Sequence, residues 1–124
     1  MHRLWLTLGA CFAFLSVAAG AFGAHVLRDR LEPSLLAVFE TAARYQMFHA
    51  LALLVLGLVS ATSPSRATHI AGIAFVTGTL LFSGSLYALA TTGNRWLGAI
   101  TPIGGVAFLV GWAALAVAGA SKTP

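Results

Sequence analysis

Most side chains that could carry chemistry gather around the connection between the first two long apolar runs of the chain. The candidate functional polar cluster consists of His25, Glu40, Arg44, Tyr45, Gln46 and His49, with Arg28 beside it. Polar and ionisable groups within an apolar surrounding cost free energy, so their presence there makes them candidates for a function.

Two readings of this cluster are open. Histidine titrates near neutral pH, so His25, Glu40 and His49 could pass a proton or an ion. Alternatively, the same groups tie the connection to the rest of the fold through hydrogen bonds and an ion pair. Glu40 and Arg44 are four residues apart with the acid first, the favourable order for an ion pair on a helix. We favour the structural reading, because polar groups in lipid must be satisfied by the protein itself.

Other chemistries have less support. His25, His49 and Glu40 include metal-ligand types, but their spacing matches no metal-binding motif. Cys11 is the single cysteine and lies in an apolar run, where we expect it to be a small buried apolar residue. The sequence contains no nucleophile elbow, phosphate loop or HExxH motif. We therefore expect no enzyme activity, no metal and no cofactor.

The composition indicates the solvent in which these residues sit. Of the 124 residues, 59% are hydrophobic and only 8% are charged, whereas a soluble domain carries about 25% charged residues. The net charge of +4 comes from basic residues that are scattered singly, so nucleic-acid binding is not indicated. The sequence predicts an integral membrane protein with the lipid bilayer as its surroundings.

Four apolar runs are each about long enough to cross the hydrocarbon core, which takes about 20 helical residues. They cover residues 4–26, 45–62, 68–91 and 97–119, and we expect residues 1–124 to form a single transmembrane domain. The first run could instead be a cleaved signal peptide ending near Ala24. Its length and the three further apolar runs favour a retained helix.

The polar segments between the runs predict where helices begin and end. Pro33 and Ser34 start a helix that continues to about Ser60, and its mixed first turns predict an interfacial amphipathic segment before the second span. Pro102 either begins the fourth helix or kinks it. The positive-inside rule does not set the sidedness, because Arg3, Arg66 and Lys122 on one side nearly balance the basic residues on the other.

Small and polar residues within the runs predict how the helices pack. Small residues let helix backbones approach closely in a membrane, and the candidates are Gly20, Gly23, Gly84, Gly104, Gly105 and Gly111. Ser16, Gly20 and Ala24 follow one another at intervals of four residues on one helix face. Hydrogen bonds between helices are expected from Ser83, Ser85 and Tyr87, and an aromatic belt from Trp5, Trp96 and Trp112.

Four motifs in order resemble a known family. They are Gly20–His25 (GAFGAH), Glu40–Leu51 (ETAARYQMFHAL), Phe82–Tyr87 (FSGSLY), and Thr101–Gly105 (TPIGG) followed by Gly111 and Trp112. The combination resembles the domain-of-unknown-function family 423, which comprises small bacterial inner-membrane proteins of the YgdD and YwdK type and a eukaryotic relative, transmembrane protein 256. The resemblance runs from about Leu8 to Ala118. It implies a multi-pass protein of the bacterial plasma membrane and assigns no catalytic or cofactor residues.

Taken together, these features predict an all-α, four-helix membrane bundle whose second helix has an interfacial extension. The expected function is non-enzymatic, through interaction with a membrane-protein partner or self-association into a homo-oligomer. The alternative is a small oligomeric transporter or channel that uses His25, Glu40 and His49. A transporter needs a continuous polar path through the membrane, whereas an interaction protein buries its polar groups in closed pairs at one end and exposes a face of small residues to lipid.

Overall fold

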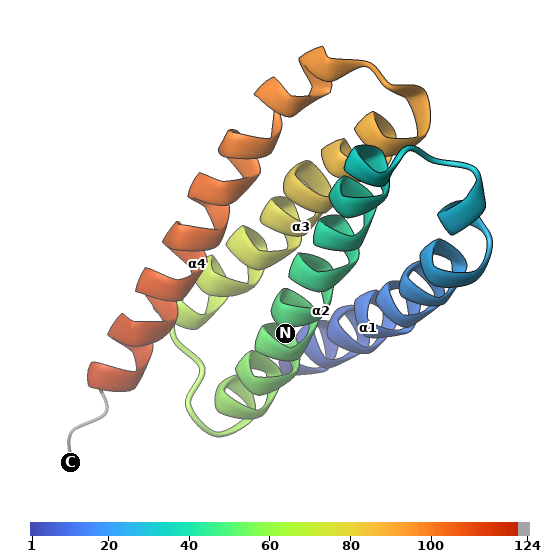
Figure 1. Cartoon of the computed structure of the whole chain (residues 1–124). Helices are drawn as coiled ribbons and strands as arrows, with labels where there is room; N and C mark the ends of the chain where they lie inside the picture. Colours follow the sequence, from blue (N-terminus) through green and yellow to red (C-terminus); the bar gives the residue numbers. More distant parts are fainter. Residues whose placement is uncertain (122–124) are drawn as a thin grey trace.

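The computed structural model describes residues 1–121 as four long helices joined by short connections (Figure 1). The helices are α1 (His2–His25), α2 (Pro33–Thr62), α3 (Arg66–Thr92) and α4 (Thr101–Ala120), with 3-10 turns η1 (Leu27–Asp29) and η2 (Arg95–Ala99) in the first and third connections. Each helix, with η2 counted as part of the fourth, is long and apolar enough to cross a membrane. The predicted all-α bundle with four spans is confirmed. Lys122, which was counted above for the positive-inside rule, lies outside the described residues.

α2 is the longest helix and begins with the predicted extension. Pro33 is its first residue, a position where the missing N–H group of proline costs nothing. Thirty helical residues span about 45 Å, more than the roughly 30 Å hydrocarbon core. Either the first turns of α2 therefore lie outside the core or the helix is strongly tilted.

The turns that connect the other helices have recognisable caps. Ser65 and Thr68 form a capping box at the start of α3, in which the Ser65 hydroxyl accepts from the Thr68 N–H at 3.1 Å and Thr68 Oγ1 accepts from the Ser65 N–H at 3.0 Å. α3 ends at Gly93, whose φ of +75° is the left-handed conformation that glycine adopts at little cost. Pro102 lies in the first turn of α4, so it begins this helix and does not kink it.

α2 and α3 form the centre of the bundle, with α1 packed against α2 and α4 packed against α3 (Figure 1). The main core cluster draws on all four helices and consists of Trp5, Ala52, Leu53, Leu56, Ala71, Phe75 and Phe108. A smaller cluster of Leu27, Phe39 and Ala90 closes the end near η1. Because α1 and α4 do not pack on each other, much of their surface remains available to lipid.

α1 packs mainly against α2, along one narrow seam. Its buried residues are Trp5, Gly9, Ser16 and Gly23. Gly9, Ser16 and Gly23 follow one another at intervals of seven residues, the spacing typical of left-handed helix pairs. The expected four-residue spacing does not describe this seam, because Gly20 and Ala24 are exposed.

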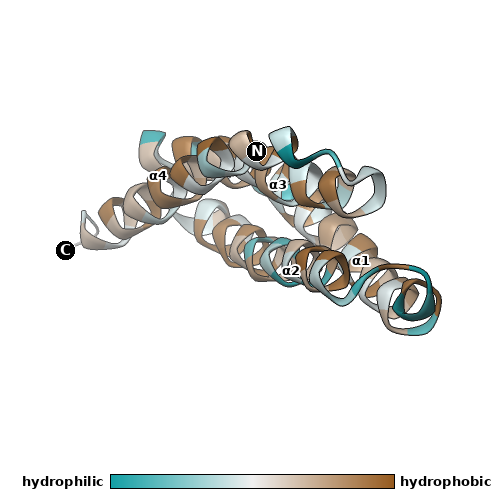
Figure 2. Cartoon of the chain, turned by 45° about the horizontal axis from the view of Figure 1, so that its top comes forward, coloured by the Kyte–Doolittle hydropathy of each residue, from teal (hydrophilic) through white to brown (hydrophobic). Residues whose placement is uncertain are grey.

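Hydrophobic residues predominate along the helices, and many of them are exposed, whereas hydrophilic residues lie mainly in the connections and in part of α2 (Figure 2). Trp96, which lies in the third connection and is 67% exposed, fits the expected aromatic belt. The belt prediction is wrong for Trp112, which lies in the middle of α4 and bonds to another helix. It is also wrong for Trp5, which is buried against Gly72 of α3.

Candidate functional site

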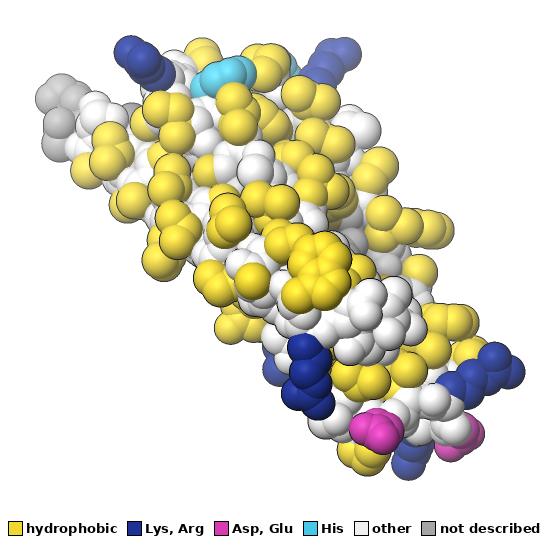
Figure 3. All heavy atoms as spheres, turned by 90° about the horizontal axis from the view of Figure 1, so that it is seen from above, with side chains coloured by type: hydrophobic (Ala, Val, Ile, Leu, Met, Phe, Trp, Pro, Cys, Tyr) yellow, Lys and Arg dark blue, Asp and Glu magenta, His cyan; other side chains and the backbone are white. Residues whose placement is uncertain are grey.

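The structure divides the candidate functional polar cluster between two places. His25, Glu40 and Arg44 are exposed near the connection between α1 and α2. Gln46 and His49 are buried between the helices. Figure 3 shows an apolar body between two charged ends, with acidic side chains at one of them. The acidic residues of the chain are Asp29, Glu32 and Glu40, which all lie in or near that connection.

Glu40 and Arg44 are not joined by the expected ion pair. Within residues 1–121, no oxygen of Glu40 lies within 4.0 Å of a guanidinium nitrogen of Arg44, and both side chains are exposed. Charged side chains in contact with water gain little from pairing, because water already solvates them. The charged part of the cluster therefore does not anchor the connection through this pair.

Gln46 joins three helices through its amide group. Its Nε2 donates to the main-chain oxygen of Phe12 in α1 at 2.8 Å. Its Oε1 accepts from the Tyr87 hydroxyl in α3 at 2.8 Å. Tyr87 in turn packs edge-on against Phe39, with ring centroids 5.0 Å apart. Gln46 therefore links α1, α2 and α3 in the middle of the bundle. The sequence had predicted that Tyr87 donates a hydrogen bond between helices, and its acceptor is Gln46.

His49 is held by α2 itself and by α4. Its Nδ1 lies 2.7 Å from the Tyr45 main-chain oxygen, and its Nε2 lies 3.1 Å from Nε1 of Trp112. An indole N–H can only donate, so Nε2 must accept and the proton of the ring belongs on Nδ1. Both ring nitrogens of the uncharged histidine are thereby occupied.

Aromatic side chains enclose the His49 ring, which is 4% exposed. The ring of Phe108 stacks on it with centroids 3.5 Å apart and planes within 7°. Phe75 lies beside it at 5.7 Å. On the open side of α2, Tyr45 stacks against Phe82 with centroids 4.8 Å apart. The histidine is thus packed in an apolar shell, which suits a structural role.

Serine hydroxyls complete the bonds between helices. Ser16 of α1 donates to the main-chain oxygen of Ala43 at 2.6 Å, and Ser83 of α3 donates to that of Ala42 at 2.8 Å. Both acceptors belong to α2. The sequence singled out Ser83 as a donor but read Ser16 only as a small packing residue. The seven-residue interval between Ser16 and the buried glycines was the signal that could have found it.

Between α3 and α4, the hydroxyls of Ser85 and Thr101 are 2.6 Å apart. The buried polar side chains of the spans thus have partners, and in residues 1–121 only Ser60 Oγ is buried without one. The bonds lie between neighbouring helices as separate pairs and short chains. The polar groups are thus paired as expected of an interaction protein, but the pairs lie along the middle of the helices and not at one end.

The glycines named from the sequence fall into two groups. A Cβ on Gly104 would meet the backbone of Phe82, and one on Gly111 would meet the Phe75 ring. Gly23 lies against the ring of Phe39, which a Cβ would approach to 3.1 Å. Around Gly20 and Gly84 a Cβ would meet nothing within 4 Å, and at Gly105 it would meet one ring atom at 4.0 Å. The second group marks helix surface that the bundle itself leaves open.

A groove runs between α1 and α3, with α2 as its floor. Two adjoining cavities of about 480 and 150 Å³ share Leu15, Gln46 and Tyr87 in their walls. The apolar part of the walls includes Phe12, Leu15, Ala18, Phe22 and Leu80. On the α3 side, Gly84 has no side chain that would narrow the groove. We call this feature the α1–α3 groove. Since the polar ends of Gln46 and Tyr87 bond to each other, the groove suits an apolar occupant.

The residues considered for metal binding are not brought together. In residues 1–121, no group of three or more His, Cys, Asp or Glu side chains is arranged to hold a metal ion. His25 ends α1 at the surface, whereas His49 lies deep in α2. The expected burial of Cys11 is wrong, because this residue is exposed on the outer face of α1.

The fold and its apolar surface define a class: a small α-helical membrane protein with four spans whose polar side chains bond between helices. Relatives agree with this class. A UPF0382 membrane protein of Staphylococcus epidermidis is 49% identical over 116 residues, which cover 94% of each chain. The UPF0382 membrane protein YwdK of Bacillus subtilis is 44% identical over 117 residues, which cover 94% of this chain and 95% of YwdK.

The chain belongs to the DUF423 family, whose description is "Protein of unknown function" and whose model matches residues 19–105. The family resemblance seen in the four sequence motifs is confirmed. No solved structure matches the chain.

Proposed function

We propose that the protein is a non-enzymatic interaction protein of the bacterial plasma membrane and that it self-associates through the α1–α3 groove. The observation that carries this proposal is the pairing of the polar side chains inside the spans. A relay needs groups that are free to exchange protons or ions, whereas Gln46 and His49 have committed their polar atoms to fixed partners. The relatives, from Staphylococcus and Bacillus, support a bacterial membrane.

The groove supplies the surface for self-association. It follows α1 from Phe12 to Phe22, about 15 Å of helix, which suits a helix better than a compact ligand. Gly84 allows a second backbone to approach closely, because nothing lies within 4 Å of a Cβ at this position.

A second copy is the occupant that we favour, because α1 itself has a suitable surface. Its lipid-exposed face carries the small residues Ala10, Cys11, Ala18 and Ala21 around the exposed ring of Phe14, and no charged residue lies between Leu4 and Ala24. Small side chains on a helix without charges match a groove with apolar walls. Two copies related by a two-fold axis would each offer the same surface, as most homo-oligomers do.

Cross-linking in lipid vesicles tests this proposal, with Cys11 as the reporter. Cys11 lines a shallow depression that shares Leu15 with the groove. A bifunctional maleimide should therefore link two wild-type chains through Cys11, and Gly84→Leu should reduce the linked fraction several-fold by filling the groove.

Gly119→Leu is the matched control, since Gly119 is exposed on α4 and a Cβ there also meets nothing within 4 Å. It should leave the linked fraction unchanged, and Cys11→Ala should abolish it. Wild-type protein that remains monomeric and unlinked over a range of protein-to-lipid ratios would refute self-association. Cross-linking only to another protein in native membranes would assign the groove to a different partner.

A further inference from the structure

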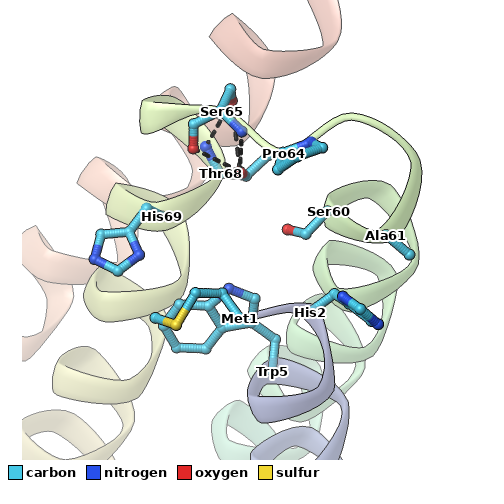
Figure 4. Close-up of a pocket in the computed structure, with 9 residues that line it drawn as sticks. All are labelled: Met1, His2, Trp5, Ser60, Ala61, Pro64, Ser65, Thr68 and His69. Carbon is cyan, nitrogen blue, oxygen red and sulfur yellow. Dashed lines mark hydrogen bonds between the residues drawn. The ribbon is translucent and has the colours of Figure 1, made fainter.

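At the opposite end from the acidic residues, a pocket opens between the start of α1 and the turn joining α2 to α3 (Figure 4). Its volume is about 360 Å³, within the roughly 300–1,000 Å³ range of small-molecule sites. Trp5 and Ser60 form the inner wall, and His2 and His69 lie nearer the outside. The pocket is separate from the α1–α3 groove, and the proposed self-association does not involve it.

Ser60 is the residue that makes this pocket unusual. Its side chain is 5% exposed and its hydroxyl oxygen is the buried side-chain atom in residues 1–121 that has no hydrogen-bond partner. Figure 4 shows this hydroxyl directed into the space enclosed by α1 and the α2–α3 turn. A buried hydroxyl without a partner is costly, so its placement points to a ligand that accepts its hydrogen bond.

The surroundings of Ser60 favour an anion. Ser65 and Thr68, at the N-terminus of the 27-residue α3, line the pocket, and a helix N-terminus attracts negative charge. Arg3 and Arg66 belong to the first turns of α1 and α3, at the same end of the molecule. All three acidic residues of the chain lie at the other end.

Three side chains that line the pocket carry hydrogen-bond donors. His2 and His69 each carry a ring N–H, and Ser60 adds its hydroxyl. The Trp5 ring, with the His69 ring edge-on to it at 6.1 Å, forms an apolar wall. A buried hydroxyl donor beside an apolar wall and a helix N-terminus fits a phosphate group that carries an organic substituent.

From these features we propose that the pocket binds a phosphate group, with Ser60 as an inner donor and His69 as an outer donor. The phosphate belongs either to a lipid headgroup, which lies at this depth of a bilayer, or to a soluble phosphate or phosphate ester. The chemistry of recognition is the same for both sources.

Binding can be measured with the full chain, delipidated in a non-ionic detergent without phosphate. The probes are phosphatidylglycerol, the matching diacylglycerol without phosphate, and glycerol 3-phosphate together with inorganic phosphate. Native mass spectrometry and the shift in melting temperature report binding. If phosphatidylglycerol binds and the soluble phosphates do not, the site belongs to a lipid headgroup. If the soluble phosphates bind, the site belongs to a free ligand.

Ser60→Ala and His69→Ala should each weaken phosphate binding by about tenfold, the size expected for one lost hydrogen bond to a charged group. Ser34→Ala and His25→Ala are the matched controls, because both residues are exposed at the other end of the molecule. They should bind as the wild type does. Equal binding of diacylglycerol and phosphatidylglycerol, without binding of soluble phosphates, would overturn the proposal, as would Ser60→Ala with unchanged affinity.

The melting temperature without ligand gives a second readout. Ser60→Ala removes a hydroxyl that has no partner in the free protein, so this variant should melt at the same temperature as the wild type or higher. A clear decrease would mean that the hydroxyl is already satisfied in the free protein, and the argument for a ligand would fail. If His69→Ala does not fold, Ser60→Ala and its control still decide the question.

Discussion

His49 illustrates how a titratable residue can serve packing at the scale of a single side chain. Its two nitrogens are bonded to Tyr45 and Trp112, and its face lies on Phe108. A proton accepted at Nε2 would break the bond from the Trp112 indole, because that group has no lone pair to receive a hydrogen bond. The geometry therefore favours the structural reading of this residue.

Two substitutions of His49 should distinguish the contribution of its stacked ring to stability from that of its hydrogen bond to Trp112. His49→Ala removes the stacked ring and leaves the Trp112 N–H without a partner, so we expect a loss of about 2–4 kcal/mol in the free energy of unfolding. His49→Phe keeps a ring on Phe108 and should cost only about 1 kcal/mol, the size of one hydrogen bond between helices in a membrane.

Titration with sodium dodecyl sulfate in mixed micelles measures these free energies. His25→Ala is the matched control and should stay within about 0.5 kcal/mol of the wild type, because His25 is exposed. If His49→Ala is no more destabilising than His25→Ala, the packing role assigned to His49 is wrong.

At the scale of the helices, the apolar runs of the sequence predicted the elements well. The first three runs coincide with α1, the second part of α2, and α3 to within two residues at either end. The fourth run begins in η2, because Arg95–Ala99 forms a 3-10 turn before Thr101 opens α4. Crossing a membrane requires a long apolar helix, so composition alone is informative about the number and length of the spans.

The sequence was less informative about which helix faces meet. Membrane helices are apolar on all sides, so no polar stripe distinguishes the buried face of α1 or α4 from the lipid-facing one. Glycine spacing was ambiguous for the same reason, since Gly104 lies in a contact and Gly84 does not. For the candidate site, the donors Ser83 and Tyr87 could be anticipated, whereas the pairing of His49 with Trp112 depends on helix positions that the sequence does not give.

Alanine substitutions at two glycines should test the contact between α3 and α4. Gly104→Ala places a methyl group against the backbone of Phe82, which cannot move aside as a side chain can. We expect a loss of about 1–3 kcal/mol in the free energy of unfolding. Gly84→Ala meets no atom and should be neutral or stabilise α3 by up to about 1 kcal/mol.

The comparison uses two helical glycines that differ in their neighbours, so helix propensity acts alike in both variants. Circular dichroism during denaturation follows the unfolding of each. Equal stability of the two variants would show that α3 and α4 separate more easily than the close contact at Gly104 indicates.

For the molecule as a whole, the two ends carry different charged side chains, and the polar side chains between them are bonded to each other or to the main chain. The connection between α1 and α2 carries acidic and basic side chains, and the other end carries basic side chains and the pocket around Ser60. Between these ends, interhelical hydrogen bonds use the polar atoms of Gln46 and His49. This distribution supports the proposed interaction role rather than a path for ions.

Proteoliposomes should accordingly show no saturable proton or cation flux above that of empty vesicles. His49→Phe, which keeps the ring in place, should behave like the wild type. A pH-sensitive dye inside the vesicles and a potassium gradient with valinomycin report proton movement. Saturable flux in the wild type that His49→Phe abolishes would establish the transporter alternative instead.

The acceptors of the serine bonds are main-chain oxygens of α2, at Ala42 and Ala43, and Gln46 likewise donates to a main-chain oxygen of Phe12. A carbonyl has two lone pairs, so each oxygen can accept a side-chain donor and still take part in its helix. Every residue type carries this oxygen, and the identity of the acceptor residue is therefore free to change during evolution as long as its size fits. Only the donors depend on the type of side chain. We therefore expect amino-acid substitutions to be most restricted at Ser16, Gln46 and Ser83.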